Sequence, residues 1–249
     1  MPAYRYHGRL SVIVPVKDEA DNIEPLVREI VAALTGVARF EIVYVDDGST
    51  DATGERLAAM KRECAELRVI RHRTPCGQSR AVTTGVMAAR HEWIATLDGD
   101  GQNDPADIPR LLAELENPAH PPNLELLIGW RTRRNDTWLR RVSSRIANRV
   151  RAGLLRDHTP DTGCGLKLFA RETFLRLPNF DHMHRFLPAL VIRNGGSVVS
   201  IPVGHRPRAS GVSKYGVRNR LWVGLVDLLG VAWLQRRARL PELAAGSDF

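Results

Sequence analysis

Three acidic clusters, two of which also contain glycines, each follow a short apolar run, and their residue types could bind a cation or a phosphorylated ligand. They are Lys17-Asp18-Glu19, Asp46-Asp47-Gly48-Ser49 and Asp98-Gly99-Asp100-Gly101-Gln102. Asp-Gly pairs also simply turn a chain. In an open parallel sheet, however, ligands bind beyond the carboxyl ends of the strands. If the three apolar runs are parallel strands, the clusters meet at one edge and form one cleft.

Asp98 and Asp100 form an Asp-x-Asp pair directly after the apolar run 93–97. The intervening and following glycines, Gly99 and Gly101, allow a backbone in which both carboxylates converge. Mg²⁺ in proteins is bound through one or two carboxylates plus substrate phosphates, and it keeps several waters. The pair therefore predicts a site for Mg²⁺ or Mn²⁺ that takes a phosphorylated substrate.

A carboxylate at Asp46 could accept hydrogen bonds from a base or a ribose hydroxyl, by analogy with dinucleotide sites. No Gly-x-Gly-x-x-Gly follows the first apolar run, and the sequence contains no P-loop motif. These absences argue against a Rossmann oxidoreductase and against a P-loop NTPase.

Short apolar runs alternate with helical patterns, and these elements must position the three clusters. We expect strands at 10–16, 40–45, 67–71, 93–97 and 124–129, with a further strand at 197–203. We expect helices over 23–34, 52–66, 79–90, after Pro105, and in an arginine-rich stretch at about 138–155. Repeated strand and helix units predict an α/β fold with a mostly parallel central sheet flanked by helices.

The chain of 249 residues is long enough for one such domain and a short appendage. We place the domain at 1–216 and the appendage at 217–249, after a polar loop that contains Gly211 and Gly216. The apolar run from Leu221 to Leu234 is too short to span a bilayer and is interrupted by Asp227. With arginines at both ends, it predicts an amphipathic helix on a membrane surface. A homo-oligomer interface is the alternative.

The charge balance points to anionic partners, because 36 Lys and Arg stand against 28 Asp and Glu. Nine arginines and one acid lie within 131–156. A nucleic-acid-binding protein is a rival hypothesis, but the sequence has no helix-turn-helix, zinc-finger or RNP signature. Acidic strand ends would also repel a phosphate backbone. We therefore expect nucleotide phosphates and acidic lipids as partners, and no nucleic acid.

Cysteine and histidine usage indicates no disulfide framework and no zinc site. Cys64, Cys76 and Cys164 are far apart and odd in number, which fits reduced thiols in the cytoplasm. His182 and His184 lie close together, but no cysteine or further histidine pair accompanies them. We expect a cytoplasmic protein attached peripherally to the membrane.

Three segments resemble the family 2 inverting glycosyltransferases of GT-A fold: 11–19, 45–51 and 98–105. Four later segments resemble one branch of that family, the dolichol-phosphate mannosyltransferases and bacterial polyprenyl-phosphate glycosyltransferases: 129–131, 161–167, 184–190 and 208–216. The resemblance covers about residues 10–216. It implies a metal-dependent enzyme that transfers a sugar from a UDP- or GDP-linked donor to a polyprenyl phosphate.

The same resemblance assigns roles to individual residues. The donor site would contain Pro15, Glu19, Asp46, Gly77, Gln78 and Arg80. The metal and the diphosphate would be held by Asp98, Asp100 and Gln102. The acceptor phosphate would be bound by Arg131, Arg140, Ser144 and Arg208, with Lys214 nearby. Of these residues, the resemblance places Asp98, Asp100, Arg131, Arg140 and Arg208 closest to the reaction.

An arginine-rich acceptor site agrees with the chemistry of a phosphate nucleophile. A phosphate monoester is already anionic, so it needs cations that position it rather than a general base. The alternative is a family 2 transferase that acts on a hydroxyl of a glycan or glycolipid, with Asp161 as the base. The arginines favour the phosphate acceptor.

Overall fold

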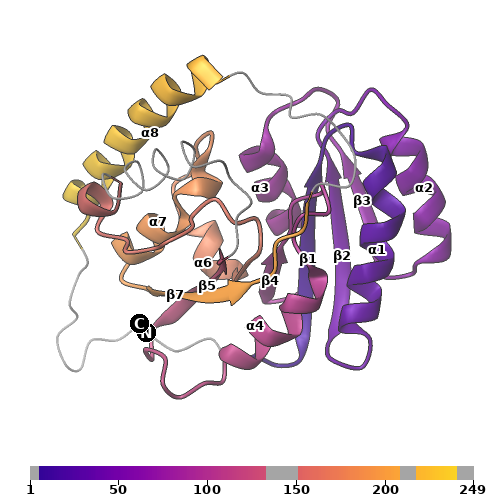
Figure 1. Cartoon of the computed structure of the whole chain (residues 1–249), viewed down its shortest axis with the longest axis horizontal. Helices are drawn as coiled ribbons and strands as arrows, with labels where there is room; N and C mark the ends of the chain where they lie inside the picture. The colour runs from indigo at the N-terminus through magenta and orange to yellow at the C-terminus, as the bar shows by residue number, and fades with distance from the viewer. Residues whose placement is uncertain (1–5, 133–150, 208–216, 240–249) are drawn as a thin grey trace, which may run out of the picture.

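The computed structural model describes residues 6–132, 151–207 and 217–239 (Figure 1). Its first half consists of β1 (Arg9–Val16), α1 (Ala20–Leu34), β2 (Arg39–Asp46), α2 (Thr53–Glu63), β3 (Leu67–Arg71), α3 (Gln78–Ala88) and β4 (Trp93–Thr96). Its second half consists of η1 (Pro105–Asp107), α4 (Ile108–Glu114), β5 (Leu124–Arg131), β6 (Lys167–Ala170), α6 (Arg171–Leu175), η2 (Met183–Arg185), α7 (Leu187–Arg193), β7 (Ser197–Val203) and α8 (Val217–Arg237).

The strands form one seven-stranded sheet in the order β3-β2-β1-β4-β6-β5-β7. All strand pairs are parallel except those of β6, which runs antiparallel to both β4 and β5. The expected mostly parallel sheet is therefore confirmed. Because β1 and β4 are parallel neighbours, Pro15 and Asp98 come to the same edge.

Helices cover both faces of the sheet, so the central strands are apolar on both sides. Val12 and Val14 of β1 join the core layer that contains α1, whereas Ile13 joins the opposite layer with α3. At Gly85 of α3 a Cβ atom would lie 2.4 Å from Ile13 Cγ2. The helix can approach β1 this closely only because residue 85 has no side chain.

Four elements were not expected from the sequence: β6, α6, η2 and α7. β6 has only four residues, all buried, and its place comes from pairing with two distant strands. The expected arginine-rich helix is helical at residues 151–155. Its part at 138–150 lies outside the described residues, as does the domain boundary near Gly211 and Gly216.

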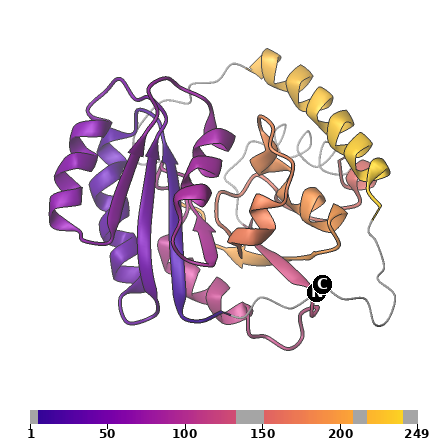
Figure 2. The same cartoon turned by 180° about the vertical axis from the view of Figure 1, so that it is seen from behind.

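Helix α8 packs on α7 at the side of the molecule opposite to α1 and α2, as both Figure 1 and Figure 2 show. Val231 and Ala232 are buried in the contact. Two polar side chains also face the domain: Asp227 Oδ2 lies 3.0 Å from Nδ1 of His182, and Gln235 Nε2 donates to the Leu155 carbonyl at 2.8 Å.

The outer face of α8 is apolar, with five side chains that are 40–59% exposed: Val223, Leu225, Val226, Leu229 and Trp233. Arg236, Arg237 and Arg239 follow at the C-terminal end and are exposed. Apolar side chains thus lie on both sides of α8, since Val231 and Ala232 are buried on the domain and larger ones face outward. An ordinary surface helix buries its apolar stripe and exposes a polar face. No helix in the described part of the chain is both long and apolar enough to cross a bilayer.

Candidate active site

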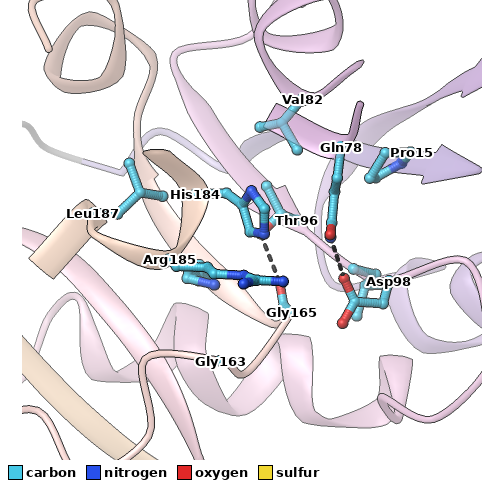
Figure 3. A pocket seen from close by; sticks show the side chains of 12 residues that line it. Pro15, Gln78, Val82, Thr96, Asp98, Gly163, Gly165, His184, Arg185 and Leu187 are labelled. Carbon is cyan, nitrogen blue, oxygen red and sulfur yellow. Dashed lines mark hydrogen bonds between the residues drawn. The ribbon is translucent and has the colours of Figure 1, made fainter. Parts of the chain in front are cut away.

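A cavity of about 110 Å³ lies beyond the carboxyl ends of β1 and β4, at the edge that the sequence predicts. Its walls include Pro15 at the end of β1, Gln78 at the start of α3 and Asp98 after β4. His184 of η2 lies on the side opposite Gln78 and Asp98 (Figure 3), and Lys167 of β6 also lines the cavity. Five separate segments of the chain therefore converge on one cavity.

Asp98 sits at the centre of this arrangement. Gln78 Nε2 donates a hydrogen bond to its Oδ1 at 2.8 Å (Figure 3), and a Cβ atom at Gly165 would lie 2.3 Å from its Oδ2. Burial raises the pKa of Asp98 above its ordinary value, and the charge of nearby Asp100 raises it further. Two carboxylates that repel each other where water is scarce would be stabilised by a divalent cation.

The donor set therefore fits Mg²⁺ or Mn²⁺, which prefer oxygen ligands. Asp98 and Asp100 would hold the ion, as the sequence predicts. Gln102 lies beside them, since its N–H donates to Asp100 Oδ1 at 3.2 Å. A metal contact of its own stays a prediction, because the Gln102 side-chain Nε2 points to the carbonyl of Arg206 at 3.5 Å.

Arg206 connects the segment after β7 to the Asp-x-Asp loop. Its backbone N–H donates to the carbonyl of Gln102 at 2.9 Å. Its guanidinium reaches Glu29 of α1 at 2.8 Å and Asp104 at 2.7 Å. The start of this segment is thus held against the predicted metal site from three directions.

The turn before α3 is held by Asp47, which the sequence analysis did not assign to the site. Its Oδ2 accepts from the N–H of Gly77 at 2.8 Å, and its Oδ1 accepts from the N–H of Cys76 at 2.7 Å. His72 Nδ1 lies 2.8 Å from the same Oδ1, and its Nε2 lies 2.9 Å from the Thr84 hydroxyl. Asp47, His72 and Cys76 are close enough for a metal site. Their hydrogen bonds instead make Asp47 a brace for the turn.

Burial alone would raise the pKa of Asp47, but the hydrogen bonds from Cys76, His72 and Gly77 lower it below its ordinary value. The braced residue Gly77 has φ +89°, a conformation that favours glycine. Gln78 follows directly and reaches Asp98. Asp47 therefore acts on the site through the position of this turn.

Asp46 lies at the end of β2, as expected, but its side chain is 0% exposed. Its Oδ1 accepts from the N–H of Ser49 at 2.8 Å. Arg71 Nε lies 3.1 Å from Oδ2, although the angle is outside hydrogen-bond geometry. The carboxylate thus stabilises the turn after β2, and the contact with a nucleoside stays a prediction.

The other two predicted donor residues lie outside the lining of the cavity. Glu19 precedes α1 and accepts from Asn22 Nδ2 at 2.7 Å. Arg80 is on the first turn of α3, half exposed, with Nε 3.9 Å from Asp181. Their nucleotide contacts also stay predictions.

Arg131 at the end of β5 forms a bidentate ion pair with Asp161. Nε lies 2.6 Å from Oδ2 and Nη2 lies 2.8 Å from Oδ1. Burial alone would lower the pKa of Arg131, but Asp161 raises it, so the guanidinium stays charged. Both oxygens of Asp161 are engaged by this pair. The other predicted acceptor residues lie outside the described residues: Arg140, Ser144, Arg208 and Lys214.

Two residues of the cavity were missed as catalytic or binding candidates. Lys167 is 4% exposed, and burial lowers its pKa while the charges of Cys164 and Asp98 act in the opposite direction. Burial also lowers the pKa of His184 well below its ordinary value, so the ring is neutral at pH 7. Its Nδ1 lies 2.7 Å from the Ser79 hydroxyl. In the sequence, only the family resemblance of segments 161–167 and 184–190 pointed to Lys167 and His184.

Comparisons with known proteins agree with this geometry. The profile of Glycosyl transferase family 2 matches residues 11–177. A dodecaprenyl-phosphate galacturonate synthase of Rhizobium johnstonii is 38% identical over 245 residues, 96% of this chain and 70% of the relative. An undecaprenyl-phosphate 4-deoxy-4-formamido-L-arabinose transferase of Edwardsiella ictaluri is 31% identical over 211 residues, 84% of this chain and 63% of the relative.

Two solved structures share the fold. Glucosyl-3-phosphoglycerate synthase from Mycobacterium tuberculosis, with Mn²⁺, uridine diphosphate and glucosyl-3-phosphoglycerate, has a TM-score of 0.71 at 19% identity. The match covers 95% of this chain and 82% of that one. A mannosyltransferase from Pyrobaculum calidifontis, with GDP-mannose and Mn²⁺, has a TM-score of 0.67 at 22% identity. This match covers 95% of this chain and 66% of that one.

Proposed function

Because this chain belongs to glycosyl transferase family 2, we propose that it transfers a sugar from a nucleoside-diphosphate donor to a polyprenyl phosphate, with inversion at the anomeric carbon. The observation that carries the proposal is the cavity in which Asp98 faces Lys167 beside the Arg131–Asp161 pair. The two relatives are named for polyprenyl-phosphate products or substrates, which supports the acceptor.

The leaving group of this reaction is a nucleoside diphosphate. A bound Mg²⁺ or Mn²⁺ would stabilise its negative charge. Asp98 and Asp100 would hold the ion, and Gln78 fixes the orientation of the Asp98 carboxylate through its hydrogen bond. The Asp47 brace keeps Gln78 in place by holding the preceding Gly77 turn.

The acceptor side favours a phosphate over a hydroxyl. A hydroxyl acceptor needs a general base, and Asp161 was the candidate. Asp161 is 5% exposed, and both of its oxygens accept from Arg131. Its role is to orient the guanidinium. A guanidinium has five N–H groups, of which Asp161 takes two in the described structure, so Arg131 can still bind a phosphate.

The acceptor lipid requires access to a membrane, and α8 supplies the surface. Its outer face exposes Leu225, Leu229 and Trp233, and exposed arginines lie at its C-terminal end. Trp at headgroup depth and arginines next to acidic lipids are typical of interfacial helices. The enzyme therefore docks on an anionic membrane through α8 while the cavity takes the lipid phosphate.

A comparison of two acceptors tests the proposal. The purified protein with Mn²⁺ and a panel of UDP- and GDP-sugars is expected to glycosylate polyprenyl phosphate and not polyprenol, which has the same chain and a hydroxyl instead. Arg131→Lys and Arg140→Ala should lower transfer by roughly 10- to 100-fold, as expected for the loss of about 1.5–3 kcal/mol per charged hydrogen bond. Donor affinity should change little.

Asp161→Asn is the complementary variant, because it separates the two acceptor hypotheses. Loss of the carboxylate should weaken the position of Arg131 and raise the KM for polyprenyl phosphate. If the wild type glycosylates polyprenol or a sugar hydroxyl but never polyprenyl phosphate, and Asp161→Asn abolishes that activity, the enzyme is a hydroxyl-directed transferase instead.

The sugars in the names of the two relatives differ in charge. Galacturonate has a carboxylate, whereas 4-deoxy-4-formamido-L-arabinose is uncharged. The sugar that this chain transfers is therefore decided by the chemistry of its own cavity.

A further inference from the structure

A second cavity, of about 420 Å³, lies where α8 meets α7 and residues 153–156, and three arginines line it: Arg156, Arg193 and Arg236. We call it the arginine cavity. Among the residues that the structure describes, none lines both this cavity and the active-site cavity. Helix α7 connects the two, since Leu187 at its start lines the active-site cavity and Arg193 at its end lines the arginine cavity. They are therefore about one length of α7 apart, roughly 10 Å for its seven residues.

The positive charge of the arginine cavity is not balanced by a carboxylate. In the described parts of the chain, no aspartate or glutamate lines the cavity, and the side chains of Arg156 and Arg236 form no ion pair. The acid next to Arg156 in the sequence, Asp157, is buried, and its Oδ2 lies 3.4 Å from Nη1 of Arg151 instead. A ligand of complementary charge is therefore an anion.

Arg193 is held in place by neutral oxygens, which leave its charge uncompensated. Its Nε donates to the carbonyl of Leu234 in α8 at 3.1 Å, and its Nη1 donates to Asn194 Oδ1 at 2.9 Å. A guanidinium has five N–H groups, so these two bonds leave three for a ligand. The wall thus contains one positioned arginine at the end of α7, and Arg156 and Arg236 beside it.

The backbone at Arg156 gives no reason for an arginine at this position. Its φ is +52°, a region that residues other than glycine rarely adopt. Its N–H donates to the carbonyl of Ala152 at 2.8 Å, so it follows the last turn of the helical residues 151–155, where glycine or asparagine is usual. The guanidinium of Arg156, by contrast, lines the arginine cavity.

The exposed apolar face of α8 leads to the arginine cavity. Leu225 and Leu229 are 45% and 56% exposed, and Arg236 follows Leu229 by seven residues, which places it on the same side of the helix two turns further on. Ala232, one turn before Arg236, also lines the cavity. The α7 residue Ile192 adds an apolar part to the wall. A ligand that matches both features has an anionic group at the arginines and hydrocarbon along α8.

We propose that the arginine cavity binds the phosphate of an anionic phospholipid, with the acyl chains of this lipid along the apolar face of α8. Arginine forks suit phosphate oxygens, because they can donate two parallel hydrogen bonds. The inference rests on the proposed function in one respect, since it concerns the membrane on which α8 is proposed to dock. The site is separate from the acceptor phosphate, which is proposed to bind at Arg131. A phospholipid held at the end of α7 would fix the orientation of the domain on the bilayer.

A monomeric lipid tests the cavity without a membrane surface. Dihexanoyl-phosphatidylglycerol below its critical micelle concentration is titrated calorimetrically into the full chain. The wild type should bind it, and Arg156→Gln should weaken binding by roughly 10-fold or more, as expected for the loss of charge-assisted hydrogen bonds. Arg156→Lys keeps the charge but loses the fork, so it should also weaken binding.

Arg237→Gln is the matched control. It removes the same charge from the neighbour of Arg236, but Arg237 does not line the cavity, and its Cζ lies 5.9 Å from the ring centroid of Trp233. Its affinity for the monomeric lipid should stay close to that of the wild type. Arg156 and Arg237 are both exposed, so both variants should fold, and unchanged melting temperatures check this.

Vesicles of phosphatidylglycerol in phosphatidylcholine separate a defined site from general surface charge. At about 0.5 M NaCl the diffuse attraction between arginines and the bilayer is screened. The loss caused by Arg156→Gln should persist there, whereas any loss caused by Arg237→Gln should disappear. Equal losses in the two variants under all conditions, or full binding by Arg156→Lys, would mean that only net charge matters and would overturn the inference.

The identity of the ligand is tested with three other compounds. Inorganic phosphate that binds as tightly as the short-chain lipid would make this a site for free anions. Dihexanoyl-phosphatidylcholine that binds equally well would show that the negative charge of the lipid is not recognised. A short-chain polyprenyl phosphate that depends on Arg156 more strongly than phosphatidylglycerol does would make the cavity part of the acceptor site. Each of these results would overturn the inference.

The titration needs neither donor nor acceptor, so it can fail or succeed independently of the proposed function. Binding of dihexanoyl-phosphatidylglycerol that depends on Arg156, by a protein that transfers no sugar to polyprenyl phosphate, supports the phospholipid site and refutes the proposed reaction. Transfer to polyprenyl phosphate in detergent, by a protein that does not bind the short-chain lipid, supports the reaction and refutes the site.

Discussion

At the scale of single residues, the site combines charges that burial has removed from water. Asp98 has a raised pKa, and Lys167 has a lowered one, because each is desolvated. Arg131 and Asp161 compensate each other through a bidentate pair. In the described residues, Asp98 and Lys167 have no bidentate ion pair of this kind. This is the expected state of a site that receives its counter-charges from a cation and a substrate.

Asp100→Asn tests the metal site. The amide keeps the size of the side chain but removes its charge, so it should weaken the binding of Mn²⁺ and lower transfer by roughly 100-fold or more. The melting temperature without metal should stay within about 2 °C of the wild type. Thermal stabilisation by Mn²⁺ is the direct readout. Asp181→Asn, at an exposed position, is the control, and an unchanged Mn²⁺ response in Asp100→Asn would exclude the site.

At the scale of elements, two turns at the edge of the sheet are held by side chains at the carboxyl end of β2. Asp46 ends β2 and Asp47 follows it, yet Asp46 closes the turn to Ser49 and Asp47 holds the turn before α3. Successive residues of a strand project to opposite sides, which is why two adjacent aspartates brace two different turns. The position of Gln78 depends on the turn before α3, which Asp47 holds.

Asp47→Asn should destabilise the protein, because the amide would place an N–H₂ group against at least one N–H donor of the turn. The expected loss at pH 7 is roughly 1.5–3 kcal/mol of unfolding free energy. The folded pKa of Asp47 lies below its ordinary value, so its contribution is present above pH 4 and is lost as the pH falls through the folded pKa.

The measurement is urea unfolding of wild type and Asp47→Asn at pH 7 and at pH 3. The difference between them should shrink at pH 3, and Asp21→Asn, an exposed aspartate of α1, should show no such pattern. A difference that stays constant with pH would mean that the Asp47 charge does not stabilise the turn.

At the scale of the whole molecule, α8 is the element through which we propose that the enzyme meets its acceptor. Asp227 and Gln235 fix the rotation of the helix by binding His182 and the carbonyl of Leu155. Leu229 and Trp233 are consequently left 56% and 59% exposed. The anchoring of α8, by these polar groups together with buried Val231 and Ala232, thus leaves an apolar outer surface on the domain.

Leu229→Ser with Trp233→Ser should weaken binding to vesicles that contain acidic phospholipids by at least 10-fold, since burial of each side chain contributes roughly 1.5–3 kcal/mol. High salt should weaken the remainder, because Arg236 and Arg237 act through screened charge. Val37→Ser, an exposed apolar residue elsewhere, is the control. If the wild type ignores such vesicles and the double variant instead changes a dimer to a monomer, the face is an oligomer interface.

The sequence alone determined the parallel strands, the shared edge and the Asp-x-Asp pair, because apolar periodicity and turn residues act over a few positions. Only the tertiary structure decided the place of β6. Its pairing of Lys167 with Thr96 joins residues far apart in the sequence, and local sequence patterns do not predict such pairs. The tertiary structure also decided that Asp47 rather than Asp46 braces Gly77, and that Asp227 and Gln235 of α8 face the domain. Each of these depends on which side chains lose water, and burial is set by contacts between distant segments.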